Sequence, residues 1–252
     1  WDAFVQQADK LGAAYIATGH YAKVQHLKGS SVLKKGKDTL KDQAYVLWGI
    51  PAHTLSRTLF PLGDLTKEEV RNIAREHKFE TAEIPESMEI CFVADNNYKR
   101  FLKDYVPEKM AEISAGEIVD ESGKVVGEHS GYTDYTIGQR KGLGLSTPEP
   151  RYVSNIDPTN NQIRIGKKGS LSKNNCEVSG VNWLVENISF PCDVQTQIRY
   201  NSPVIDAKIS QSENQFSVQF LHPQIAVTPG QSIVFYKDDI VLGGGIIEKN
   251  IE

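Results

Sequence analysis

The spacing of apolar residues changes once along this chain, near Gly116, and that change constrains the fold more than any other feature. Upstream, in a stretch such as 4–11, apolar residues recur every three or four positions. Downstream, in a stretch such as 216–220, they alternate with polar residues. Helical spacing predicts helices with one buried face, and alternation predicts half-buried strands. We therefore expect an α/β part followed by a largely β part.

The beginning of the chain has the pattern of a doubly wound α/β sheet. Residues 4–11 predict a helix that ends at Gly12, and residues 13–18 predict a short buried strand. Ligands of such sheets bind beyond the carboxyl ends of the strands. Gly19 and His20 directly follow the predicted strand, so we expect them at that edge.

The segment before Gly116 also predicts a strand pair and further helices. We expect a strand pair over 22–40 with a lysine- and glycine-rich tip at 34–37, a helix capped by Asp42 that ends at Pro51, a helix over 65–79, and a helix near Tyr98–Tyr105. The 65–79 helix is the best specified, because Thr66 and Glu69 can form a capping box. Its expected buried stripe consists of Val70, Ile73, Ala74 and His77.

The second part predicts hairpins and then a barrel. Turn residues at 120–123 and 157–161 each separate two apolar runs, which is a hairpin signal. From about residue 174 onward, short strands follow one another at even spacing, as in a small β-barrel. We predict an α/β remnant of a doubly wound, Rossmann-like domain, a central α+β domain and a C-terminal small β-barrel. The expected boundaries are 1–55 with 80–100 returning to it, 56–172, and 173–252.

The composition excludes several classes of protein. Of the 252 residues, 39% are hydrophobic and 24% are charged, as in ordinary globular proteins. No apolar run approaches the roughly 18 residues that span a bilayer, so no membrane partner is expected. The start at Trp1 is no secretory signal and lacks a methionine, so we expect a fragment whose natural start lies upstream. Three cysteines without a C-x-x-C pair predict a reducing cytoplasm and no metal site.

Charge is distributed unevenly along the chain. The net charge is -4, which gives no global signature of nucleic-acid binding. Residues 136–173, however, hold seven Lys or Arg against two acidic residues, whereas residues 174–252 hold four against nine. A basic segment in an acidic chain is either an anion-binding face or a solvated loop surface, and charge alone leaves both open.

The cysteine at position 91 is the strongest candidate for chemistry. It lies in the run Pro85-Glu86-Ser87-Met88-Glu89-Ile90-Cys91-Phe92-Val93, between a proline and a polar stretch. Thiolate chemistry requires partial exposure and a nearby positive charge or helix N-terminus. An isolated cysteine is more often a small buried apolar residue. The motifs around it favour the nucleophile.

Five runs occur in an order and spacing that resemble one family. They are Ala17-Thr18-Gly19-His20-Tyr21-Ala22, Lys41-Asp42-Gln43-Ala44-Tyr45, Ser87-Met88-Glu89-Ile90-Cys91-Phe92, Tyr135-Thr136-Ile137-Gly138-Gln139-Arg140-Lys141-Gly142-Leu143-Gly144 and Val227-Thr228-Pro229-Gly230-Gln231. Together they resemble the bacterial tRNA-specific 2-thiouridylases, which thiolate the wobble uridine. The resemblance extends from one end of the chain to the other.

The resemblance implies a chemistry and its reactants. ATP with Mg²⁺ adenylates the uracil 2-oxygen, a persulfide on Cys91 attacks, and AMP leaves. The persulfide sulfur would come from a cysteine desulfurase or a relay protein. The family's Ser-Gly-Gly-Val-Asp-Ser ATP-pyrophosphatase loop, its Asn-Pro-Asp loop and its first catalytic cysteine do not occur here. We therefore expect the chain by itself to be inactive.

The resemblance also assigns binding residues. Gly19 resembles the glycine that contacts ATP, and the positions that resemble tRNA contacts are His20, Lys41, Asp42, Gln43, Arg199, Tyr200 and Gln231. Arg199 and Tyr200 are expected in a strand over 195–200, where arginine would hold phosphate and tyrosine would stack on a base. Arg140 and Lys141 are our own hypothesis for tRNA backbone contacts. Structural alternatives remain open: Asp42 as a helix cap, and Gly19 and Gln231 as turn residues.

Two other functions stay open at this stage. One is a non-catalytic RNA- or protein-binding module, because acidic barrels also serve as docking domains. The other is an adenylating enzyme with the same type of loop, such as an amidotransferase-like synthetase, which would not explain Cys91. The remaining cysteines, Cys176 and Cys192, are expected to be structural.

Overall fold

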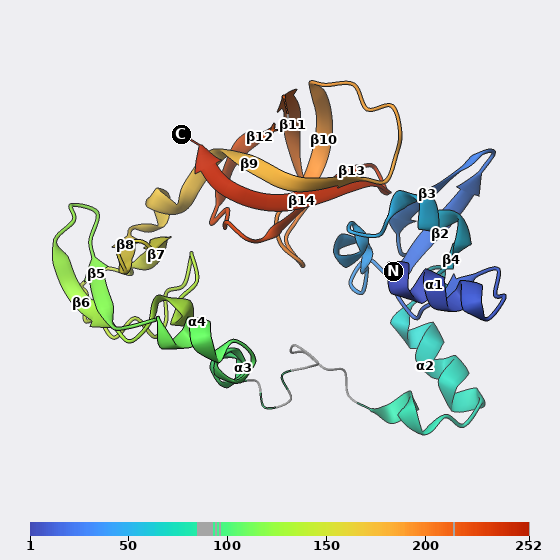
Figure 1. The fold of residues 1–252 in the computed structure, drawn as a ribbon, viewed down its shortest axis with the longest axis horizontal. Helices are drawn as coiled ribbons and strands as arrows, with labels where there is room; N and C mark the ends of the chain where they lie inside the picture. Colours follow the sequence, from blue (N-terminus) through green and yellow to red (C-terminus); the bar gives the residue numbers. More distant parts are fainter. Residues whose placement is uncertain (85–92, 94, 96, 214, 252) are drawn as a thin grey trace. The chain divides into compact units, whose positions relative to one another are not determined.

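The computed structural model describes residues 1–84, 93, 95, 97–213 and 215–251 (Figure 1). The chain divides into two compact units. The first consists of Trp1–Ile84, Asn174–His222 and Thr228–Glu252, and the second consists of Pro85–Lys173 and Pro223–Val227. Among the described residues, no helix is both long and apolar enough to span a membrane.

The amino-terminal part of the first unit contains short helices and strands. Its elements are α1 (Asp2–Lys10), β1 (Ile16–Ala17), β2 (Ala22–Leu27), β3 (Ser30–Lys35), η1 (Ala44–Leu47), η2 (Ala52–Arg57), β4 (Thr58–Leu59), α2 (Lys67–Glu76) and η3 (Glu80–Glu83). β1 and β4 pair in parallel, as in a doubly wound sheet. The helix α1 ends before Gly12, whose φ of 68° fits the predicted C′ position.

The carboxyl-terminal part of the first unit is a closed barrel. Its strands are β9 (Ser172–Trp183), β10 (Cys192–Gln197), β11 (Ile205–Ser212), β12 (Gln215–Ile225), β13 (Ser232–Lys237) and β14 (Ile240–Ile251). They follow the order β13-β10-β11-β12-β9-β14, and β13 also pairs with β14, which closes the sheet (Figure 1). The barrel predicted from the alternating pattern is thereby confirmed.

One hydrophobic core joins the amino-terminal part to the barrel. The hairpin β2–β3 is added to β14, where Lys34 pairs with Ile240. The buried members of the core from the amino-terminal part are Ala22, Leu33, Ala44, Tyr45, Leu47, Ile50, Leu55 and Phe60, and those from the barrel are Leu184, Val234, Tyr236 and Val241. Because both parts contribute buried side chains to this core, they are held as one body.

The described residues of the second unit form two α-helices and a four-stranded sheet. Its elements are α3 (Tyr98–Tyr105), α4 (Pro107–Ala111), β5 (Gly116–Val119), β6 (Val125–His129), η4 (Tyr132–Asp134), β7 (Tyr152–Asp157), β8 (Gln162–Gly166) and η5 (Lys168–Leu171). The strand order is β6-β5-β8-β7, with β5 and β8 parallel. Both predicted hairpins and the predicted helix at 98–105 are confirmed.

Two predictions about the segment 22–51 were wrong. The tip of the β2–β3 hairpin lies at Lys28 and Gly29, and the basic residues 34–37 lie at the end of β3 and beyond it. The predicted helix from Asp42 is only the single 3-10 turn η1, which begins after Gln43. Gln43 is held by hydrogen bonds to Tyr21, the residue before β2, and these contacts compete with a helix that begins at Asp42.

The helix α2 has the predicted capping box but not the predicted burial. The Thr66 hydroxyl accepts from the backbone N–H of Glu69 at 3.2 Å, and the Glu69 carboxylate accepts from that of Thr66 at 2.6 Å. No residue of α2 is buried, and Ile73 is 41% exposed. Helical spacing decides which face is apolar, but burial also needs a partner surface, and that is not a property of the helix sequence.

Candidate functional site

The Lys41–Gln43 triplet is fixed to the β2–β3 hairpin by hydrogen bonds. The Gln43 side chain accepts from the backbone N–H of Tyr21 at 3.0 Å, and the Gln43 N–H donates to the Tyr21 carbonyl at 2.9 Å. The Asp42 carboxylate accepts from the Gly36 N–H at 2.7 Å and from the Ala44 N–H at 3.3 Å. Burial raises the pKa of Asp42, which these bonds partly offset. The triplet therefore has a defined conformation beside the hairpin.

Tyr45 connects this triplet to the barrel. Its side chain is 7% exposed, and its hydroxyl donates to the carbonyl of Ser232 at 2.8 Å. Its ring centroid lies 6.0 Å from that of Tyr200. Ser232 follows Gln231 in the chain, so Tyr45 contacts Tyr200 directly and the turn of Gln231 through its neighbour.

The Arg199–Tyr200 pair lies in a turn and not in the predicted strand. β10 ends at Gln197, and the Ser202 N–H and hydroxyl both donate to the Arg199 carbonyl, at 3.1 Å and 2.9 Å. Asn201 has a φ of 65°, a left-handed conformation that ends a strand. The turn leaves the Tyr200 side chain 44% exposed. An exposed tyrosine in a turn can offer its ring face to a base.

The Arg199 guanidinium is held beside the same cluster. Its Nη2 donates to the Thr228 hydroxyl at 2.8 Å, and Thr228 is 9% exposed. Burial raises the pKa of Tyr45 to about 12, although the nearby charge of Arg199 acts in the opposite direction. Gln231, in the turn that follows Thr228, is exposed. Tyr45 thus contacts Tyr200 and the neighbour of Gln231, lies near the charge of Arg199, and directly follows the triplet and Ala44 in the chain. We refer to these residues as the cluster around Tyr45.

Gly19 and His20 lie just beyond the carboxyl end of β1. Gly19 is exposed, and a Cβ placed there would meet only a Leu62 methyl carbon, at 3.7 Å. His20 contacts the rings of Trp1 and Phe60, and its Nδ1 lies 2.7 Å from the Thr18 hydroxyl. Burial lowers the pKa of His20, so its neutral form is favoured. His20 precedes Tyr21, which links this edge to Gln43.

Arg140 and Lys141 are exposed on a glycine-rich loop of the second unit. The loop is fixed by two backbone hydrogen bonds, from Gly138 to the Val153 carbonyl at 2.8 Å and from Val153 to the Gln139 carbonyl at 2.9 Å. Gly138 has a φ of 88°, which a residue with a side chain rarely adopts. Apolar neighbours in the loop pack on the sheet, so the two cations are directed to solvent by a rigid base.

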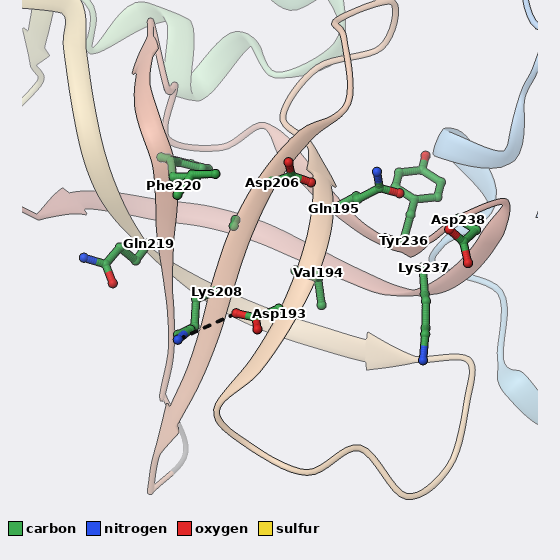
Figure 2. Close-up of a pocket in the computed structure, with 12 residues that line it drawn as sticks. Asp193, Val194, Gln195, Asp206, Lys208, Gln219, Phe220, Tyr236, Lys237 and Asp238 are labelled. Atoms are coloured by element: carbon green, nitrogen blue, oxygen red, sulfur yellow. Dashed lines mark ion pairs between the residues drawn. The ribbon is translucent and has the colours of Figure 1, made fainter.

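A separate hollow on the barrel differs in charge from the cluster around Tyr45. It has a volume of about 650 Å³ and is lined by residues of β10 to β13. Figure 2 shows Asp193, Asp206 and Asp238 around it, with Lys208 pairing with Asp193 at 3.7 Å. Three carboxylates against the ammonium groups of Lys208 and Lys237 leave the lining with a net negative charge, which disfavours a phosphate backbone there. The composition of this hollow therefore separates it from the cluster around Tyr45.

The two described cysteines both have a raised thiol pKa. Cys176 is buried, and burial raises the pKa of its thiol to about 12. Burial, together with Asp193, also raises the pKa of Cys192. Cys91, the predicted nucleophile, lies outside the described residues. Across those described residues, His, Cys, Asp and Glu form no group that could hold a metal ion.

Sequence reasoning missed the residues that hold the cluster together. Tyr45 belongs to one of the five runs but was expected to lie on a helix, and Thr228 and Ser232 were given no role. The bond between Tyr45 and Ser232 joins residues 187 positions apart. The apolar character of the segment 44–47 was a signal for burial, but no local pattern identifies such a distant partner.

Comparison with known proteins shows the family. The chain is 45% identical over 255 residues to the tRNA-specific 2-thiouridylase MnmA of Chlorobium phaeobacteroides (strain BS1), covering 100% of the chain and 70% of that protein. The chain belongs to the tRNA-specific 2-thiouridylase family. The family members of Natranaerobius thermophilus and Halothermothrix orenii are each 45% identical to it, and the chain covers 68% and 69% of their lengths.

Three family models divide the chain in the same order as the predicted fold. Residues 1–95 match a tRNA methyl transferase HUP domain, 99–167 a tRNA methyl transferase PRC-barrel domain, and 173–247 an aminomethyltransferase beta-barrel domain. The predicted sequence of a Rossmann-like part, a central domain and a C-terminal barrel is therefore confirmed. The names of these models describe other group transfers, but each model matches only part of the chain. The 2-thiouridylases match over the whole chain, and they therefore identify the family.

Proposed function

We propose that this chain is part of an enzyme that transfers sulfur to position 2 of the wobble uridine in tRNA. The observation that carries the proposal is the identity of about 45% with tRNA-specific 2-thiouridylases over the whole chain. The clustering of Lys41–Gln43, Arg199, Tyr200 and Gln231 around one buried tyrosine supports it. These residues come from distant parts of the sequence, yet each was assigned to the same ligand.

The proposed chemistry has three steps. The uracil 2-oxygen attacks the α-phosphorus of ATP, pyrophosphate leaves, and N3 loses its proton. The terminal sulfur of a persulfide on Cys91 then attacks C2, the C2–O bond breaks, and AMP leaves. A thiolate of a second cysteine outside this chain attacks Sγ of Cys91, so the S–S bond breaks and a disulfide forms. N3 regains a proton as the thiocarbonyl forms. In a variant of this sequence, the second cysteine attacks the persulfide first and releases hydrosulfide as the nucleophile.

ATP is proposed to bind at the carboxyl end of β1. Gly19 follows that strand, is exposed, and carries no side chain that would separate a nucleotide from the backbone. Mg²⁺ would enter with the phosphates. The neutral form of His20 beside it could donate or accept one hydrogen bond to RNA.

The tRNA would lie across the cluster around Tyr45. Lys41 and Arg199 supply positive charge for phosphates, Tyr200 an exposed ring for an unstacked base, and Gln43 and Gln231 amides for hydrogen bonds. Asp42 is already engaged by Gly36, so its remaining oxygen would be the one that contacts RNA. Arg140 and Lys141 would add backbone contacts from the second unit.

The remaining proposals concern the donor and the organisation of the protein. A cysteine desulfurase or a relay protein would supply the persulfide sulfur, and the reaction would take place in the cytoplasm. We also propose that residues 80–100 return to the Rossmann-like domain, whose first section is 1–55, so that Cys91 can reach the nucleotide. The central and barrel domains would then be 56–172 and 173–252. The chain by itself would be inactive.

Persulfide labelling tests the proposal. The chain is incubated with a cysteine desulfurase and cysteine, digested, and analysed by mass spectrometry for a gain of one sulfur on each cysteine. We expect the added sulfur on Cys91 and not on Cys176 or Cys192, because the folded environment raises the pKa of both of those thiols. In the full-length protein, tRNA nucleosides are analysed for 2-thiouridine. Equal labelling of all three cysteines, or no 2-thiouridine, would contradict the proposal and favour a binding module.

A further inference from the structure

Tyr45 has two separate contacts that point in different directions from one buried side chain. Its hydroxyl donates to the Ser232 carbonyl at 2.8 Å, and its ring lies 6.0 Å from the Tyr200 ring. Tyr45 itself is 7% exposed, whereas Tyr200 is 44% exposed. The buried ring of Tyr45 therefore packs beside the exposed ring of Tyr200.

The backbone of Tyr45 gives it a third connection. It is the second residue of η1, which directly follows Gln43, and Gln43 is fixed to Tyr21 by two hydrogen bonds. A movement of the Tyr45 backbone would therefore be transmitted to the Lys41–Gln43 triplet. The three connections lead to the triplet, to Tyr200 and to the turn of Gln231.

We propose that Tyr45 is a positioning residue that sets the spacing between the three groups of tRNA contacts. The inference rests on the proposed function and extends it to a residue that would not touch RNA. It predicts that position 45 needs a tyrosine: phenylalanine would keep the ring but lose the bond to Ser232, and an aliphatic residue would lose both.

The physical properties of tyrosine suit this role. The side chain has two rotatable torsions, so little conformational entropy is lost when it is held in one place. Aromatic pairs with centroids 4.5–7 Å apart attract each other beyond their buried area. Burial raises the pKa of Tyr45 to about 12, so its hydroxyl keeps its proton and remains a donor at neutral pH. The bond to Ser232 therefore persists across the physiological pH range.

A purely structural role predicts a different kinetic result. Tyr45 belongs to the core shared by the amino-terminal part and the barrel, so its replacement lowers stability in either case. Loss of stability reduces the amount of active enzyme and lowers kcat, with KM for tRNA unchanged. Loss of positioning raises KM for tRNA while kcat at saturating tRNA stays within about twofold.

The test uses double-mutant cycles in the full-length protein, with thiolation of tRNA as the assay. We expect Tyr45→Leu and Tyr200→Ala each to raise KM for tRNA about tenfold, as expected for one lost stacking contact. If Tyr45 acts through Tyr200, the double variant raises KM about tenfold as well, whereas independent effects would multiply to about a hundredfold. Tyr45→Phe is expected to raise KM about threefold and to be similarly non-additive with Gln231→Ala.

Thr54→Val is the matched control. The Thr54 hydroxyl is also buried and donates to a backbone carbonyl in the first unit, that of Pro51, at 2.7 Å. It should lower stability and leave KM for tRNA unchanged. Tyr45→Phe decides the test by itself if Tyr45→Leu does not fold, because it removes only the hydroxyl.

The outcomes separate the inference from the proposed function. Two results would overturn the inference alone. In the first, Tyr200→Ala raises KM but the Tyr45 variants leave KM unchanged. In the second, the effects of the two single variants multiply in both double-mutant cycles. An unchanged KM for both Tyr200→Ala and Gln231→Ala means that the assigned tRNA contacts are wrong, and it overturns the inference while thiolation persists. Absence of tRNA thiolation by the wild-type full-length protein overturns the proposed function. Non-additive increases in KM with kcat preserved support both.

Discussion

Replacement of Asp42 tests whether its carboxylate anchors the segment that carries the triplet. Its Oδ1 accepts from Gly36 at 2.7 Å and from Ala44 at 3.3 Å. A hydrogen bond to a charged group contributes about 1.5–3 kcal/mol, and the longer bond adds little. Burial opposes the charged carboxylate and raises its pKa, so we take the lower half of that range. Asp42→Ala should therefore lower the free energy of unfolding of the first unit by about 2 kcal/mol.

Urea unfolding followed by tryptophan fluorescence measures this loss. The three tryptophans, Trp1, Trp48 and Trp183, all lie in the first unit, so the signal reports on that unit. With a slope of about 2 kcal/mol per molar urea, the midpoint should fall by about 1 M. Asp42→Asn keeps an acceptor oxygen and should lower the midpoint by less than half as much.

The control is Asp64→Ala, because the Asp64 side chain is 85% exposed and pairs only at the surface, with Lys23. It should move the midpoint by roughly 0.3 M or less. An Asp42→Ala midpoint as close to wild type as that of Asp64→Ala would refute the anchoring role. The carboxylate would then be available to RNA, and Asp42→Ala should instead change only tRNA affinity.

Three further predictions concern the basic loop, a helix cap and the barrel. Replacing Arg140 and Lys141 by Ala should reduce the slope of log Kd for tRNA against log salt by roughly 1.5, measured by filter binding. The Lys37 ammonium, together with the backbone of Thr66, lowers the pKa of Glu69 to about 2. The stabilisation of the folded state by the Glu69 carboxylate is therefore complete above pH 4.5 and is lost as the pH falls towards 2. The difference in stability between wild type and Glu69→Gln should therefore shrink over that interval in urea titrations. Gly244→Ala should destabilise the first unit by about 1–3 kcal/mol in the fluorescence assay, because its Cβ would lie 2.7 Å from Cγ of Trp48.

Each of these predictions has a matched control. The exposed pair Lys103 and Lys109 carries the same charge in the second unit and should leave the salt slope unchanged when replaced by Ala. Glu68→Gln changes the same helical turn without touching the cap and should show no loss over the acid interval. A Cβ added at Gly49 would lie more than 4 Å from the neighbouring atoms of the described residues, so Gly49→Ala should leave the urea midpoint near that of the wild type. An effect of equal size in a control would contradict the corresponding reasoning.

Local signals in the sequence predicted much of the fold. Thr66 and Glu69 indicated the start of α2, because a capping box involves residues three positions apart. The turns at 120–123 and 157–161 indicated their hairpins for the same reason. The predictions that failed depend on contacts outside the local pattern: η1 begins only after Gln43, which bonds to Tyr21, and the turn at 199–202 ends β10 before Tyr200.

The candidate site was predicted in part. Five runs identified the family and assigned residues to ATP and tRNA. The structure places Tyr200 against Tyr45 and joins Tyr45 to Ser232, the neighbour of Gln231. Resemblance compares positions one at a time, so it names residues without their mutual distances. The contacts of Tyr45 and Thr228 with that set could not be read from any run.

The sequence by itself determined the family, the order of the domains, the alternation that makes a barrel and the caps that begin helices. All of these depend on residue identity over a few neighbouring positions. Only the tertiary structure decided that β14 pairs with β9, that the amino-terminal part shares the core of the barrel, and that Tyr45 meets Ser232. These contacts join residues far apart in the chain. They arise when buried surfaces are matched in three dimensions, which no short stretch of sequence encodes.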